Sequence, residues 1–64
     1  MLIINGNNCD AIGMTISEYL TKENYDEKRV AVERNGEIIP KPQYSAVILN
    51  DGDTVEVISF VGGG

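Results

Sequence analysis

The residues best suited to chemistry are the last ones of the sequence. Gly62, Gly63 and Gly64 follow a run rich in β-branched and aromatic residues, Thr54 to Val61. That run has the composition of a strand, whereas three glycines have no side chains to pack and continue a strand only at high entropic cost. We therefore expect a thin, mobile peptide that ends in a free carboxylate and fits a narrow active site of another protein. The alternative is a frayed end, which most domains have.

Other reactive groups are few. The sequence has no histidine, and Cys9 is its single cysteine. This excludes a Ser-His-Asp or Cys-His arrangement, a histidine metal site and a four-cysteine iron–sulfur cluster. Gly62 to Gly64 precede no helix and so form no phosphate loop. Cys9 has no basic neighbour that would activate its thiol, and we expect it to be structural. The sequence predicts no catalytic residue, no metal and no bound cofactor.

Composition restricts the class of protein. A chain of 64 residues with 42% hydrophobic residues is one small folded domain at most. No stretch approaches the length of a transmembrane helix, and the N-terminus lacks the features of a signal peptide. With one cysteine, these features predict a cytoplasmic protein. Ten acidic and five basic residues give a net charge of −5, which argues against nucleic-acid and anionic membrane partners and favours a basic partner.

The first half of the chain predicts a hairpin followed by a helix. Asn5-Gly6 is a strong turn signal between a strand at 2–4 and a second at about 7–11. That turn pairs Leu2 with Cys9, so both side chains face the core. A helix from Ile16 to about Glu23 is indicated by Thr15 and Glu18, which have the spacing of a capping box. Asn24 can take the left-handed conformation that ends a helix.

The second half predicts three more strands. Val30 to Glu33 alternates in part, and Asn35-Gly36 is a second hairpin turn, which pairs Arg34 with Glu37 and Val32 with Ile39. Asp51-Gly52-Asp53 is a tight turn into the final strand, 54–61. One helix on one face of a mixed sheet makes an α+β fold, and its connections permit a parallel strand pair.

The final strand has two different faces. We assign Val55 and Val57 to the core, and Ile58 and Phe60 to the face that the single helix leaves uncovered. Exposed apolar residues beside a functional tail predict a docking patch, although single surface hydrophobes are also normal. The predicted patch consists of Ile3, Ile58, Phe60 and Val61.

By its motifs the sequence resembles the ThiS family of ubiquitin-like β-grasp sulfur carriers of thiamine-thiazole biosynthesis. The resemblance covers nearly the whole chain. It depends on the segment from Val30 to Pro40, on Tyr44, on Asp51-Gly52-Asp53 and on the Val61-Gly62-Gly63-Gly64 ending. It implies a β-grasp domain over residues 1–61 and a flexible glycine tail over 62–64.

The resemblance also implies a mechanism. The carboxylate of Gly64 would attack the α-phosphate of ATP in a partner adenylating enzyme. Sulfur from a persulfide on a sulfur-transfer protein would then displace the adenylate and leave a thiocarboxylate, which would deliver sulfur to thiazole synthase. The chain would be a cosubstrate rather than an enzyme. Three alternatives remain: a carrier for molybdopterin or another pathway, a ubiquitin-like protein modifier, and a plain interaction domain.

Overall fold

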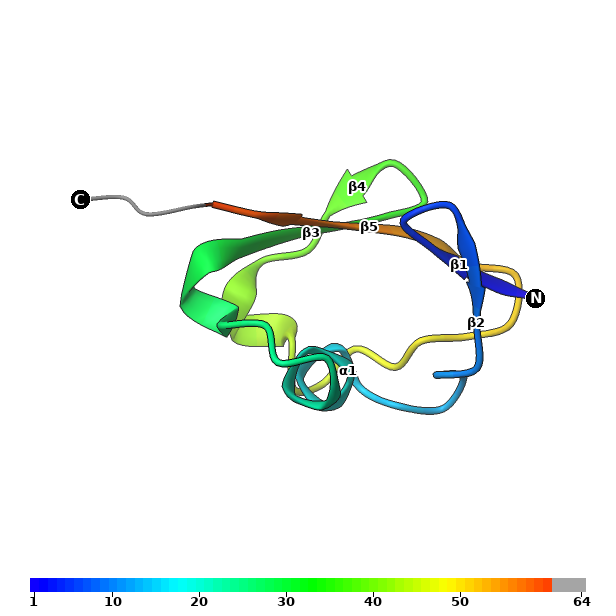
Figure 1. The fold of residues 1–64 in the computed structure, drawn as a ribbon, viewed down its shortest axis with the longest axis horizontal. Helices are drawn as coiled ribbons and strands as arrows, with labels where there is room; N and C mark the ends of the chain where they lie inside the picture. The colour runs from blue at the N-terminus through cyan, green and yellow to red at the C-terminus, as the bar shows by residue number, and fades with distance from the viewer. Residues whose placement is uncertain (61–64) are drawn as a thin grey trace.

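The computed structural model describes residues 1–60, which form a five-stranded mixed sheet with one α-helix on one face (Figure 1). The order across the sheet is β2-β1-β5-β3-β4. The strands are β1 (Leu2–Ile4), β2 (Asn7–Cys9), β3 (Val30–Arg34), β4 (Glu37–Ile38) and β5 (Thr54–Ser59). The helices are α1 (Ile16–Lys22) and two 3-10 turns, η1 (Glu27–Arg29) and η2 (Lys41–Gln43). The predicted α+β architecture is confirmed.

The two hairpins form at the Asn-Gly signals with the predicted registers. Leu2 lies opposite Cys9 in the first hairpin, and Arg34 lies opposite Glu37 in the second. Asn5 and Asn35 each have a φ of 52°, the left-handed conformation that such turns require. The second strand is shorter than predicted, because β2 ends at Cys9 and the chain then turns so that Ala11 is buried in the core.

Helix α1 begins as its sequence predicts. The Thr15 hydroxyl accepts a hydrogen bond from the Glu18 N–H at 3.1 Å, and the Glu18 carboxylate accepts one from the Thr15 N–H at 2.8 Å. Both bonds satisfy donors that the first helical turn leaves unpaired. The helix ends at Lys22, one residue earlier than predicted, and Asn24 takes the left-handed conformation with a φ of 62°.

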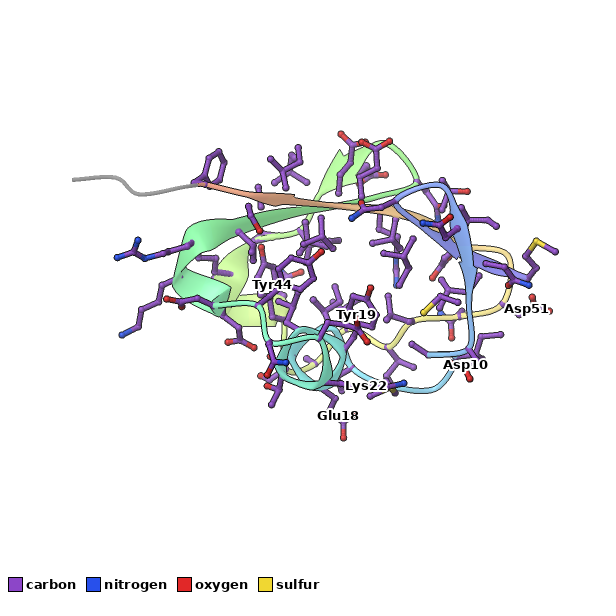
Figure 2. The ribbon with its side chains drawn as sticks, viewed as in Figure 1. Asp10, Glu18, Tyr19, Lys22, Tyr44 and Asp51 are labelled. Atoms are coloured by element: carbon purple, nitrogen blue, oxygen red, sulfur yellow. The ribbon has the colours of Figure 1, made fainter. Side chains whose placement is uncertain are left out.

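The core lies between the sheet and α1. Leu2, Ile4, Val55 and Val57 face inward as predicted, and Tyr44 is 2% exposed. Figure 2 shows Tyr19 and Tyr44 in the layer between helix and sheet. Cys9 is half-buried and packs against this core, in agreement with a structural role. Leu49 also belongs to the core, where its side chain is 1% exposed, although the sequence pattern did not predict this.

The burial of Tyr19 predicts a loss of stability in alkali. Burial, with further contributions from nearby Cys9, Glu23 and Tyr25, raises the pKa of Tyr19 to about 12. The folded state therefore keeps a proton that the unfolded chain releases near pH 10. This contribution to stability is complete below pH 10 and is lost as the pH rises toward 12.

We expect Tyr19→Phe to flatten this decline by an amount on the order of 2 kcal/mol. Urea unfolding of both proteins between pH 8 and pH 12 would measure it. Parallel stability curves for the two proteins would show that Tyr19 ionisation is not coupled to folding.

Candidate functional site

Four of the predicted site residues lie outside the described residues: Val61, Gly62, Gly63 and Gly64. The structure describes the strand that precedes them in the chain, β5. Strand β5 ends at Ser59, so that Phe60, which was predicted to belong to the strand, follows it as the last residue described. The described part of the site is therefore the carboxyl-terminal end of β5 and the sheet surface around it.

Strand β5 is the central strand, with a neighbour on each side. It pairs with β1 in parallel at Ile3–Thr54 and Ile4–Val55, which is the parallel pair that the topology permitted. It pairs with β3 in antiparallel fashion from Val30–Ser59 to Arg34–Val55. Both neighbours thus hold the first half of β5, and β3 alone pairs with its second half, from Val57 to Ser59.

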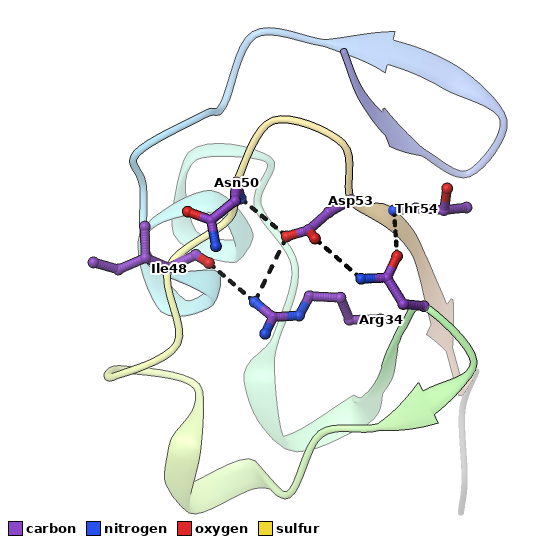
Figure 3. A network of polar contacts seen from close by, with 6 residues as sticks. Arg34, Ile48, Asn50, Asp53 and Thr54 are labelled. Atoms are coloured by element: carbon purple, nitrogen blue, oxygen red, sulfur yellow. Dashed lines mark hydrogen bonds and ion pairs between the residues drawn. The ribbon is translucent and has the colours of Figure 1, made fainter.

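A polar network fixes where β5 begins (Figure 3). The Asp53 carboxylate accepts hydrogen bonds from the Asn35 side chain and from the Asn50 N–H, both at 3.0 Å, and lies 3.6 Å from the Arg34 guanidinium. The Asn35 amide oxygen also accepts a hydrogen bond from the Thr54 N–H at 2.9 Å. Because Asp53 is 9% exposed, these partners offset the cost of burying its charge.

The outward face of the sheet carries an apolar patch. Ile58 and Phe60 are 51% and 60% exposed, as predicted for the uncovered face. Ile38 on β4 is 65% exposed and lies on the same face. It is paired with Glu33, which is paired in turn with Glu56, and Glu56 shares a face of β5 with Ile58, two residues further on. We call Ile38, Ile58 and Phe60 the outer patch. Ile3 also faces outward, on β1, but is half-buried.

The sequence analysis did not include Ile38 in the predicted patch, although the predicted register of the second hairpin already places it on the outward face. Pairing Arg34 with Glu37 places the next residue, Ile38, opposite Glu33, on the face opposite to Val32.

An acidic pair divides the outer patch. Glu33 and Glu56 lie directly opposite each other on β3 and β5, and no ion pair in residues 1–60 involves either carboxylate. Like charges directly opposite are destabilising. The outward face therefore combines exposed apolar side chains with an uncompensated negative charge, a surface that complements an apolar and basic partner.

The rest of the described chain offers no competing site. Residues 1–60 form no pocket and no cluster of three or more potential metal ligands. Within the same range, no helix is long and apolar enough to cross a membrane. Met1, Ile12 and Ile48 are also exposed apolar residues of this range, but they lie outside the strands, whereas the outer patch adjoins the end of β5.

Comparison with known proteins places this geometry in a family. The model of the ThiS family matches residues 2–64, which include the terminal glycines. The chain belongs to the ThiS family. The crystal structure of the ThiS thiamine biosynthesis protein from Geobacter metallireducens superposes with a TM-score of 0.76 at 34% identity, covering 98% of this chain and 97% of that one. This confirms the ubiquitin-like β-grasp fold.

Two curated relatives match this chain over very different shares of their own length. The sulfur carrier protein ThiS of Bacillus subtilis is 48% identical over 50 residues, or 78% of this chain and 76% of that protein. A thiazole synthase of Paramagnetospirillum magneticum is 45% identical over 64 residues, or 98% of this chain. This chain spans only 20% of that thiazole synthase, so the similarity concerns one part of a longer protein.

The acidic pair predicts a stabilising charge reversal. In Glu56→Lys the new lysine lies opposite Glu33, and we expect a gain of roughly 0.2–1 kcal/mol in the free energy of unfolding. The gain should shrink at high salt, because exposed charges are screened. Urea unfolding at two salt concentrations measures both effects.

The matched control is Glu33→Lys combined with Glu56→Lys, which places two like charges opposite each other again and should lose the gain. If Glu56→Lys is no more stable than the parent protein at low salt, the two carboxylates do not repel each other significantly.

Proposed function

We propose that this chain is a sulfur carrier of thiamine biosynthesis that holds sulfur as a thiocarboxylate on Gly64. The observation that carries the proposal is the match of the ThiS family model through residue 64, so that it includes the glycines. The similarity to the Bacillus subtilis sulfur carrier over most of both chains supports the same function. The proposal requires the carboxylate of Gly64 to be free.

The chemistry of the proposal follows from the low reactivity of a carboxylate. The Gly64 carboxylate attacks the α-phosphate of ATP and expels pyrophosphate, which creates an acyl adenylate with a good leaving group. The terminal sulfur of a persulfide then displaces AMP. Cleavage of the persulfide S–S bond by a thiol leaves the thiocarboxylate. ATP is used by the partner enzyme, and the carrier is a cosubstrate that supplies the reacting carboxylate.

The proposal assigns three partners in the cytoplasm: an adenylating enzyme, a sulfur-transfer protein and thiazole synthase. The thiazole synthase partner has the most direct support. Thiazole synthases of Paramagnetospirillum magneticum and Magnetococcus marinus contain a segment similar to this chain, at 45% and 38% identity. A carrier segment in the same polypeptide as the synthase suits an acceptor that takes sulfur directly from the carrier.

The outer patch is the docking surface that we propose for these partners. Ile58 and Phe60 lie four or more residues before Gly64, so a protein that binds the patch also reaches the tail. Ile3, on the neighbouring strand β1, extends the proposed surface, and Val61 belongs to it as a prediction that lies outside the described residues. The pair Glu33 and Glu56 adds negative charge, which favours a partner surface that combines apolar and basic side chains.

Gly63→Val tests the role of the tail. A Cβ and two methyl groups beside the reacting residue would be excluded from a channel shaped for glycine, so we expect adenylation to be lost while the fold is unchanged. ATP–pyrophosphate exchange with the adenylating enzyme measures the first, and circular dichroism the second. Normal acyl-adenylate formation by a folded Gly63→Val protein would refute a narrow channel.

Alanine at both Ile58 and Phe60 tests the docking surface. Because both side chains are exposed, we expect the free energy of unfolding to change by less than about 1 kcal/mol. The dissociation constant for the adenylating enzyme should rise roughly ten- to a hundredfold, as for the central residues of an interface. Calorimetric titration and urea unfolding separate the two effects.

Leu20→Ala is the matched control, since Leu20 is fully buried in the core. We expect it to cost roughly 2–5 kcal/mol of stability while the folded fraction binds normally. A large stability loss in the surface double variant would instead mean that Ile58 and Phe60 support the fold.

A further inference from the structure

The two sides of β5 are paired over different lengths. On the β3 side, pairing continues from Val55 to Ser59, and the Phe60 N–H then donates to the Arg29 carbonyl at 2.8 Å. On the β1 side, strand pairing stops at Val55. Figure 1 shows the β1–β2 hairpin beside the start of β5 only. The second half of β5 therefore has an open edge.

Asn5 closes the first part of that edge with its side chain. Its amide oxygen accepts a hydrogen bond from the Val57 N–H at 2.8 Å, and its amide nitrogen donates to the Val57 carbonyl at 3.3 Å. The side chain thus takes the place of one more residue of β1, while the Asn5-Gly6 turn directs the chain into β2. Beyond Val57, no residue of β1 pairs with β5.

Ser59 is the next residue of β5 whose backbone faces this edge. Backbone groups alternate between the two sides of a strand. Val57 faces β1 and Phe60 faces β3, so the N–H and carbonyl of Ser59 face the β1 side. No residue among 1–60 forms a hydrogen bond with either group, and Ser59 is exposed. Unpaired groups on a strand edge are the template for an added strand.

We propose that the adenylating enzyme docks an extended segment of its own chain on this edge, in antiparallel fashion, with one residue bonded to both the N–H and the carbonyl of Ser59. The inference rests on the proposed function. Gly64 is the fifth residue after Ser59, and a fully extended chain of that length spans at most about 18 Å. The enzyme that holds the Gly64 carboxylate must therefore present its surface within that distance of the open edge. A second copy of the chain is the less suitable occupant, because each copy carries a net charge of −5.

Ser59→Pro tests the proposal, because proline removes the N–H that the added segment would use. That N–H takes no part in the β3 ladder, so the fold should tolerate the change. We expect the KM for the carrier in ATP–pyrophosphate exchange to rise roughly five- to tenfold.

Asn8→Pro is the matched control. Asn8 lies opposite Ile3 in β2, between the bonded pairs of a two-residue hairpin, so its N–H also faces an open edge, on the far side of the sheet. The KM of the Asn8→Pro variant should stay within about twofold of the parent value, because this change removes no hydrogen bond to the adenylating enzyme.

Hydrogen exchange of the unsubstituted protein gives a readout that needs no variant. In the saturated complex with the adenylating enzyme, the Ser59 amide should exchange at least about tenfold more slowly than in the free protein, as an amide does on gaining a backbone hydrogen bond. The Asn8 amide should not change.

Three results would overturn the inference. Equal KM values for the two proline variants, with Ser59 unprotected in a complex that forms adenylate, would refute the added segment and leave the sulfur carrier in place. Protection of Ser59 that depends on carrier concentration alone would assign the edge to a second copy. Failure of the parent protein to be adenylated at all would refute the proposed function, and the edge proposal with it.

Discussion

The structure depends on how the central strand, β5, is fixed within the sheet. Two asparagines at the tips of the two hairpins bind its backbone: Asn35 bonds to the Thr54 N–H, and Asn5 bonds to both backbone groups of Val57. Each asparagine also takes the left-handed conformation that its turn requires. The residues that make the hairpins therefore also set the position and direction of β5, which leads to Phe60, the last described residue.

The two faces of the sheet differ because the single helix α1 covers only one of them. The face under α1 is filled by residues such as Val55 and Val57 and supplies the stability of a small domain. No helix of residues 1–60 covers the other face, so it can combine exposed apolar residues with Glu33 and Glu56 without disturbing the core. Residues on this face, where we propose that partners dock, can then be changed without disturbing the core. The glutamate pair is the exception, because its repulsion acts on stability as well.

Much of this arrangement could be predicted from local sequence signals. Asn-Gly turns of two residues fix the hairpin registers, and the capping box at Thr15 fixes the start of α1. What could not be predicted depends on contacts between distant segments. The placement of Leu49 follows from backbone bonds that join 47–49 to 13–16, and the binding of β5 by asparagine side chains requires the folded sheet. The role that we propose for the terminal glycines depends on the family resemblance together with carboxylate chemistry.

The intact mass of the protein is the most direct test of the account. It should be measured on protein from cells that supply the adenylating and sulfur-transfer proteins, beside a variant that lacks Gly64. We expect a species heavier by the difference between a sulfur and an oxygen atom, which is absent from the variant that lacks Gly64. If only the unmodified mass is found while ATP and the activating enzyme are present, the chain is not a thiocarboxylate carrier.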